Sequence, residues 1–394
     1  FLKDDENYEE EEAELYYHEL DRILGDVWST YDIPIVKLPT SLLLDNVSTV
    51  FEKLNSSGSD LTVFDLLNAR FIIHKLTLRK EFDRVKDTFP NIQKWYDEGH
   101  QNKLLPIYIL QAISLHKKRY LRRREILNLD KSFKDSGSFD KDEFIRYWNT
   151  SAEFVNETID RLTGREENEF GAPNYDFIPY TTLIPIIAAL LDYIKNKNNR
   201  AVCLKMISFW YWNSIAGDRY SGSSDTKGEE DYKKLISWFD KGGESPLEEE
   251  KVEGIKEAGK NSALYKAVMC LITRAGALDF IQNDPPKYSE LEDHHIFPQS
   301  KASKFGAGSS INSILNRTLI FERTNKIITN KDPSVYLNEI ISKQGITEQE
   351  LRKRLETHLI SSEAFDCMKN DDFVGFITAR EKTLTDEFNK MLQV

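Results

Sequence analysis

The stretch LEDHHIFPQS, residues 291–300, interrupts a chain that otherwise has the pattern of a helical protein. It places His294 and His295 side by side, although the whole chain has only seven histidines. A second stretch without long helical periodicity, INSILNRTLIFERTNKIITNK, follows at residues 311–331. We therefore expect a short, mainly non-helical unit at about residues 287–331, set between helical blocks.

The sequence on both sides of this unit has apolar residues at helical spacing. Clear examples are LLPIYILQAISLHKK and DEFIRYWNTSAEFVNETIDRL, both within residues 81–280. Further upstream, Thr62 and Asp65 form a T-x-x-D capping box in front of a helix. The sequence predicts a mainly α fold with a small α+β element, divided into residues 1–80, 81–280 and 281–394.

Composition indicates an ordinary globular protein with an acidic balance, 40% hydrophobic and 30% charged, with a net charge of −12. No run approaches the roughly 18 apolar residues of a membrane helix, so we expect no membrane contact. The three cysteines lie far apart, which favours a reducing cytoplasm over a disulfide framework or a zinc finger. The start, FLKDDENYEE, lacks an initiator Met and a signal peptide, which predicts a fragment of a longer protein.

The histidine pair has the residue types that metal-assisted hydrolysis of a phosphodiester needs. That reaction requires a base to activate water and a divalent cation to stabilise the charge of the transition state. An imidazole suits the base at neutral pH, and Mg²⁺ needs few protein ligands because it keeps several waters. Asn316 precedes a short strand and Asn325 follows nine residues later, so each offers a neutral oxygen donor.

DHHIFPQS and LNRTLIFERTNKIITNK together resemble the HNH, or His-Me finger, nuclease motif, in which a β-hairpin and a helix hold one metal ion. The resemblance implies that His295 is the general base and that His294 and Asn325 are metal ligands. It also implies that Asn316 fixes the loop that carries the base. Many relatives have an acidic residue where His294 stands, so Asp293 is a rival ligand. Mg²⁺ or Mn²⁺ is the expected cofactor, with Ni²⁺ or Zn²⁺ as softer alternatives.

A second resemblance lies in VFEKLNSSGSDLTVFDLLNARF, residues 50–71. It is similar to the F-x-x-x-N-x-x-G-x-x-L signature of the ParB-related NTPase domain of GmrSD-type restriction enzymes, where an HNH-type domain follows a helical region. The resemblance implies a partial α/β NTPase domain at the N-terminus, with Asn55 and Gly58 touching nucleotide. A plain helix–helix turn is the alternative for these two residues. The family's Asp-Gly-Gln-Gln-Arg motif is absent, so an NTP cofactor is expected only in a longer protein.

Charge around the histidine unit differs from that of the chain as a whole. Basic residues outnumber acidic ones there, and a basic groove can exist on an acidic protein. We expect the following residues to contact a DNA backbone: Lys301, Lys304, Arg317, Arg323, Lys326 and Lys331.

The leading hypothesis is therefore a cytoplasmic, metal-dependent DNA endonuclease of the GmrSD type that restricts modified phage DNA. Duplex cleavage would need a homodimer or two successive nicks. Two alternatives from other classes stay open. One is a catalytically silent DNA-recognition scaffold, and the other is a nucleotide-sensing regulator whose partner supplies the nuclease.

Overall fold

The structure is a computed structural model that describes residues 10–30, 62–99, 103–118, 120–135, 137–222, 224–252, 254–282 and 287–393. The chain divides into two compact units, Phe1–Asp60 and Leu61–Val394. In the first unit the described element is the helix α1 (Glu10–Thr30). Asn55, Gly58 and half of the predicted NTPase-like region lie outside the described residues.

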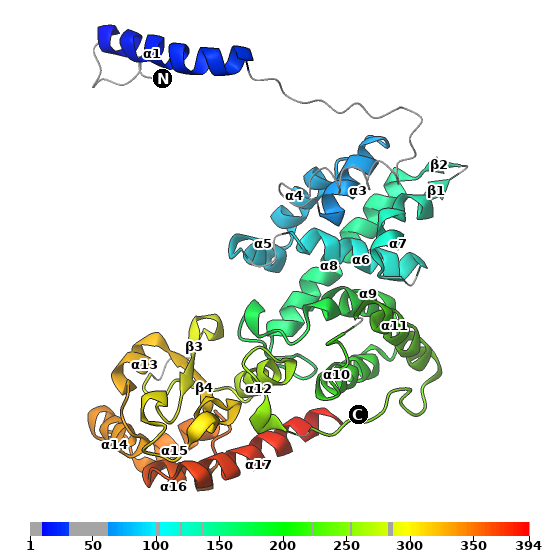
Figure 1. The fold of residues 1–394 in the computed structure, drawn as a ribbon. Helices are drawn as coiled ribbons and strands as arrows, with labels where there is room; N and C mark the ends of the chain where they lie inside the picture. The colour runs from blue at the N-terminus through cyan, green and yellow to red at the C-terminus, as the bar shows by residue number, and fades with distance from the viewer. Residues whose placement is uncertain are drawn as a thin grey trace. The chain divides into compact units, whose positions relative to one another are not determined.

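The second unit is mainly helical, as the sequence predicts (Figure 1). Its first part consists of helices and a two-residue-per-strand hairpin: α3 (Val63–Ile72), α4 (Leu78–Thr88), α5 (Pro90–Asp97), α6 (Leu105–Lys118), α7 (Arg123–Leu127), β1 (Lys134–Asp135), β2 (Ser138–Phe139), α8 (Lys141–Thr163), α9 (Ile184–Ile194), α10 (Arg200–Ala216), α11 (Ser224–Lys241) and α12 (Ala263–Arg274). Its second part contains β3 (Leu291–His295), β4 (Arg317–Phe321), α13 (Glu322–Ile328), α14 (Pro333–Gln344), α15 (Glu348–Glu356), α16 (Ser362–Lys369) and α17 (Phe373–Met391).

Local sequence signals explain where these helices begin. The capping box predicted at Thr62 is present: its hydroxyl accepts from the Asp65 N–H, and the Asp65 carboxylate accepts from the Thr62 N–H. Thr347 and Glu350 form the same box at the start of α15. These caps satisfy N–H groups that a first turn leaves without partners.

Two hydrophobic clusters form the core of the second unit. The larger one fills the space among α6, α8, α9, α10 and α12, and the smaller one lies beneath α13 to α16. Helix α17 belongs to both, because Phe376 packs in the smaller cluster and Phe388 in the larger. The sheet of β3 and β4 lies at their boundary: Leu319 faces the larger cluster and Ile320 the smaller, as the alternation of a strand requires.

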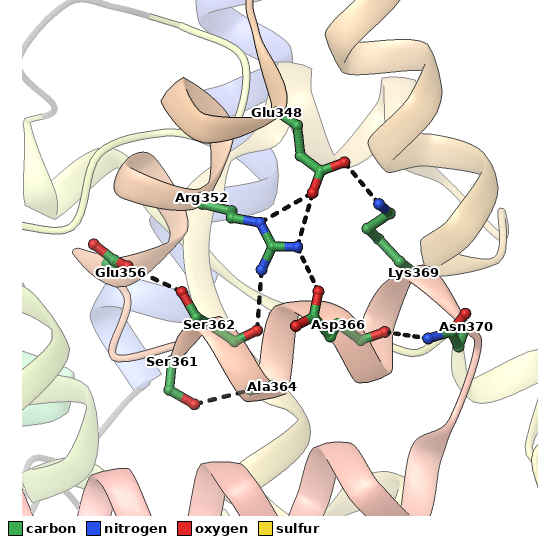
Figure 2. Close-up of polar contacts among 9 residues, drawn as sticks. All are labelled: Glu348, Arg352, Glu356, Ser361, Ser362, Ala364, Asp366, Lys369 and Asn370. Atoms are coloured by element: carbon green, nitrogen blue, oxygen red, sulfur yellow. Dashed lines mark hydrogen bonds and ion pairs between the residues drawn. The ribbon is translucent and has the colours of Figure 1, made fainter.

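Surface ion pairs join the helices that support this sheet. Arg352 donates to Glu348 one turn earlier on α15 (Nη2–Oε1, 2.7 Å) and also bonds to Asp366 of α16 (Figure 2). Lys369 of α16 reaches back to the other oxygen of Glu348 (2.7 Å), and the Arg352 guanidinium lies over the Phe365 ring. Exposed pairs of this kind stabilise a fold by at most about 1 kcal/mol each. These ion pairs join α15 to α16, and none of their side chains lines the cavity described below.

No helix within the described residues combines the length and the apolar content required to cross a membrane.

Candidate functional site

Strand β3, strand β4 and helix α13 form one strand–strand–helix unit inside the region predicted at 287–331. The strands are antiparallel, with His294 opposite Thr318 and His295 opposite Arg317. Helix α13 follows β4 directly and contacts both strands. Since alternate residues of a strand face opposite sides, His294 faces α13 while His295 and Asp293 face the other way.

Asn316 holds the long connection between the two strands in place. Its side chain is completely buried, and its Oδ1 accepts from the Phe297 N–H at 2.8 Å. Its Nδ2 donates to the carbonyl oxygens of Phe297 and Ile311, each at 2.9 Å. All of its hydrogen bonds therefore go to the backbone of the connection. The described hydrogen bonds of the Asn316 side chain do not include His295, so its place in the structure is that of a residue that shapes the loop.

His294 and Asn325 come together although thirty-one positions separate them. Nδ1 of His294 lies 2.8 Å from Oδ1 of Asn325, and the imidazole is 5% exposed. Nε2 of the same ring is buried and has no described hydrogen-bond partner. Asn325 also donates from Nδ2 to Oε2 of Glu292, at 3.1 Å.

His295 is half-buried, and its partner is a residue that the sequence did not reveal. Nε2 of His295 lies 3.0 Å from Oδ1 of Asn312. Because an amide oxygen only accepts, Nε2 carries the proton and Nδ1 keeps its lone pair. This is the tautomer that a base needs. Asn312 stands in a sequence without a recognisable local motif, so only the path of the loop shows its role.

Asp293 is held by groups on the side of the strand that faces α12. Its Oδ2 accepts from the Tyr265 hydroxyl at 2.6 Å and from Arg317 Nη1 at 3.1 Å, with Lys260 Nζ 3.7 Å away. Its Oδ1 is buried without a described hydrogen-bond partner. Arg317 is itself only 9% exposed, so it supports Asp293 and is not presented to a DNA backbone as the sequence analysis expected.

A cavity of about 420 Å³ opens beside these side chains. Asp293, His294, His295 and Asn325 all line it. Three consecutive residues of β3 and Asn325 of α13 thus share one hollow. The predicted base and the predicted ligands therefore face a common space that is large enough for a hydrated cation and a phosphate group.

Burial lowers the pKa of both imidazoles. It lowers the pKa of His294 to about 4, because the charged form loses its hydration. Burial first, and then the nearby Arg317 cation, lower the pKa of His295. Both rings are therefore neutral at pH 7, and a neutral imidazole is the form that binds a cation or accepts a proton.

The remaining basic residues around the cavity are mostly paired. Lys301 and Lys304 both reach Asp332 (Nζ–Oδ1 2.9 Å and Nζ–Oδ2 2.5 Å). Lys326 pairs with Glu322, one turn away on α13. Arg323 is exposed.

Lys331 shares one carboxylate with another lysine. Glu339 accepts from Lys331 at 2.9 Å and from Lys343 at 2.7 Å. Two lysines on Glu339 leave one positive charge in excess. The pair on Asp332 also has the Asp371 carboxylate near Lys304, so its charge is closer to balanced. Of these four lysines, Lys301, Lys304 and Lys331 belong to the set that the sequence analysis expected to contact DNA.

The donor set fits a divalent cation that keeps most of its waters. Two ligands at adjacent octahedral positions with bonds of about 2.1 Å lie about 3.0 Å apart, close to the 2.8 Å between His294 Nδ1 and Asn325 Oδ1. The described residues contain no cluster of three His, Cys, Asp or Glu side chains that could enclose a metal. In the structure Nδ1 of His294 donates its proton to Oδ1 of Asn325, because an amide oxygen only accepts. A cation would take the place of that proton when the ring proton moves to Nε2. His294 and Asn325 would then hold it by two neutral groups, and water would complete its shell.

Comparison with known proteins gives one relative and no family. No model of a protein family matches the chain. The chain is 28% identical to an uncharacterized protein of Methanocaldococcus jannaschii over 395 aligned positions. The alignment covers 90% of this chain, which spans about 65% of that relative's length.

A buried histidine behind the site gives a prediction for stability at low pH. His358 is fully buried, lies 2.7 Å from the Thr318 hydroxyl through Nδ1, and bonds the Leu278 carbonyl through Nε2. Burial lowers its pKa to about 4. The unfolded chain, with a histidine pKa near 6.5, binds the proton first, so the stability that depends on neutral His358 falls as the pH drops from 6.5 to 4. At pH 4 the expected loss is about 3 kcal/mol.

The measurement is urea unfolding of the wild type and of His358→Gln between pH 7 and pH 4. The variant should be less stable at pH 7, because the ring and its packing are lost. Its unfolding free energy should however decline less steeply with acid. Parallel curves for the two proteins would show that His358 does not contribute to the acid sensitivity.

Proposed function

We propose that this chain is a metal-dependent DNA endonuclease of the HNH type. The observation that carries the proposal is the meeting of His294 and Asn325 at 2.8 Å beside His295, on a strand–strand–helix unit that borders a cavity. A purely structural pair would not need to line a cavity together with a second imidazole.

Each residue of the site would have a separate role in the hydrolysis of the phosphodiester bond. Nε2–H of His295 donates a hydrogen bond to Oδ1 of Asn312, so the Nδ1 lone pair is free to take a proton from the attacking water. His294 and Asn325 would hold a divalent cation, Mg²⁺ or Mn²⁺, which when bound stabilises the charge that develops on the phosphate and the leaving oxygen. Asn316 keeps the loop in the shape that brings Asn312 to His295.

Positive charge supports DNA as the substrate. Glu339 neutralises only one of its two lysines, Lys301 and Lys304 gather at Asp332, and Arg323 is exposed. These cations lie on the segments that border the cavity or follow α13, where they would contact the phosphates on either side of the cleaved bond. The acidic surplus of the chain lies elsewhere, above all in residues 4–14.

We further propose a cytoplasmic enzyme that restricts modified phage DNA, with NTP regulation in a longer protein. The resemblance of residues 50–71 to the GmrSD-type signature supports this wider role. Because one site cuts one strand, cleavage of both strands would use a homodimer or two successive nicks.

The test is conversion of supercoiled DNA to nicked and linear forms. Plasmid and phage DNA carrying modified bases would be incubated with the protein in Mg²⁺, in Mn²⁺ and in chelator. We expect cleavage that requires the metal and that Asn325→Ala abolishes, because this variant removes one of two cation ligands. Lys353→Ala, which changes an α15 residue away from the cavity, is the control and should cut like the wild type.

Absence of metal-dependent cleavage on every substrate would contradict the proposal. A catalytically silent DNA-recognition scaffold or a nucleotide-sensing regulator would then be favoured. DNA retention in a gel-shift assay would point to the first, and nucleotide binding without cleavage to the second.

A further inference from the structure

Glu292 is an acidic residue of β3, next to helix α13, that neither the histidine motif nor the proposed mechanism uses. It stands two positions before His294, so both side chains leave the strand on the face covered by α13. Its Oε2 accepts from Nδ2 of Asn325 at 3.1 Å, while Oδ1 of the same amide points to His294 at 2.8 Å. One side chain of α13 is thus held from two sides by two residues of one strand.

We propose that Glu292 is a positioning residue that fixes the amide of Asn325 so that its oxygen, and not its nitrogen, faces the cation. This inference rests on the proposed metal site and goes beyond it. The two ends of an asparagine amide have nearly the same shape, so packing alone does not select between them. Only the oxygen has a lone pair for a cation, whereas Nδ2 carries two hydrogens.

A carboxylate makes that selection because it only accepts hydrogen bonds. The amide end that faces Glu292 must therefore be Nδ2, and the opposite end must be Oδ1. His294 does not make the same selection, since Nδ1 can donate a proton to an oxygen or, as the other tautomer, accept one from Nδ2. Glutamine at position 292 would lose the selection as well, because its own amide can donate or accept.

The position of Glu292 explains why it would act on the ligand and not as one. Its side chain is exposed and reaches the outer end of the amide, the end away from His294. Partners of this kind orient ligands in many metal sites, and their loss weakens metal binding by about 10- to 100-fold. Asn325 has one such partner among the described residues.

The experiment measures Mn²⁺ affinity directly, by the loss of the free-ion electron paramagnetic resonance signal on titration into the protein. Glu292→Gln should weaken binding by about 10-fold or more. Glu290→Gln is the matched control: it removes the same charge from an exposed residue that pairs with Lys287 and has no contact with Asn325. Its effect should stay below about threefold, because exposed charges are well screened.

A double variant separates orientation from charge. In Asn325→Asp both ends of the side chain are oxygens, so nothing needs to be oriented, and adding Glu292→Gln should then cost no more affinity than Glu290→Gln does. Circular dichroism and melting temperature should match the wild type in every variant.

The possible failures are distinct. If the wild type binds no Mn²⁺, the metal site and the proposed function both fail. If it binds Mn²⁺ and Glu292→Gln equals Glu290→Gln, only the role of Glu292 is overturned. If Glu292→Gln weakens binding equally with Asn and with Asp at position 325, Glu292 acts through its charge or as a ligand, and the orientation argument is wrong.

Discussion

Replacing His295 by alanine should lower the rate of metal-dependent DNA nicking by about 10²- to 10⁴-fold, the usual contribution of a general base. The physical reason is that the attacking water would lose the Nδ1 lone pair that the Asn312 contact keeps free. Cation binding should remain, because His294 and Asn325 are unchanged. The measurement is the initial rate of supercoiled plasmid loss at saturating Mn²⁺, together with Mn²⁺ affinity.

The rate of the same reaction should fall as the solution becomes more acidic. A base works in its neutral form, so the rate falls when the pH drops through its pKa. Burial and Arg317 place the pKa of His295 below its usual value near 6.5. The acid limb of the wild-type rate should therefore lie below pH 6.5, and the residual rate of His295→Ala should lack it.

Two further variants accompany this prediction, one as a control and one as a test of the Asn312 contact. His18→Ala changes an exposed histidine of α1 and should leave the rate unchanged. Asn312→Ala keeps the imidazole and frees its tautomer, so we expect a smaller loss, roughly tenfold, as for other second-layer partners of functional histidines. A His295→Ala protein that cuts at the wild-type rate would show that another group activates the water.

The second large effect concerns stability and lies far from the histidines. Asp231 on α11 is fully buried and accepts four hydrogen bonds. Arg219 donates two of them (Nε 2.7 Å and Nη2 2.6 Å), and Tyr220 and Trp210 donate at 2.6 Å and 3.0 Å. Asp231→Ala leaves these donors without an acceptor in a buried site. We expect a loss of about 3–5 kcal/mol in the free energy of unfolding.

Denaturant unfolding followed by far-ultraviolet circular dichroism checks this value. Lys369→Ala, which removes one ion of the exposed network in Figure 2, is the comparison and should cost less than about 1 kcal/mol. An Asp231→Ala protein within 1 kcal/mol of the wild type would mean that water replaces the carboxylate and that the network contributes little.

The features that depend only on short segments of the chain were predicted well from the sequence. The capping box depends on a stretch of four residues, Thr62 to Asp65, and it is present as predicted. The two quoted helical stretches match α6 and α8, since a helix is decided within each segment by the spacing of its apolar residues. The short strand expected after Asn316 is present as β4.

Contacts that depend on the path of a loop were not predictable. Asn312 reaches His295 across seventeen positions, and nothing in its neighbours distinguishes it from Asn316. Arg317 was expected at a DNA surface, yet the register of β3 against β4 places it next to Asp293 in the interior. Asp293 itself, expected as a rival ligand, has one oxygen bonded to Tyr265 of α12.

The sequence by itself determined the mainly helical architecture, the position of the strand–strand–helix unit and the residue types that meet at its histidines. These follow from periodicity, from capping and from the donor chemistry of His and Asn, all of which are properties of short segments. Only the tertiary structure decided which nitrogen of His295 is free, which end of Asn325 faces His294 and which side of the strand Asp293 occupies. Hydrogen bonds between distant segments settle these points, because their geometry depends on how two hydrophobic clusters position the sheet between them.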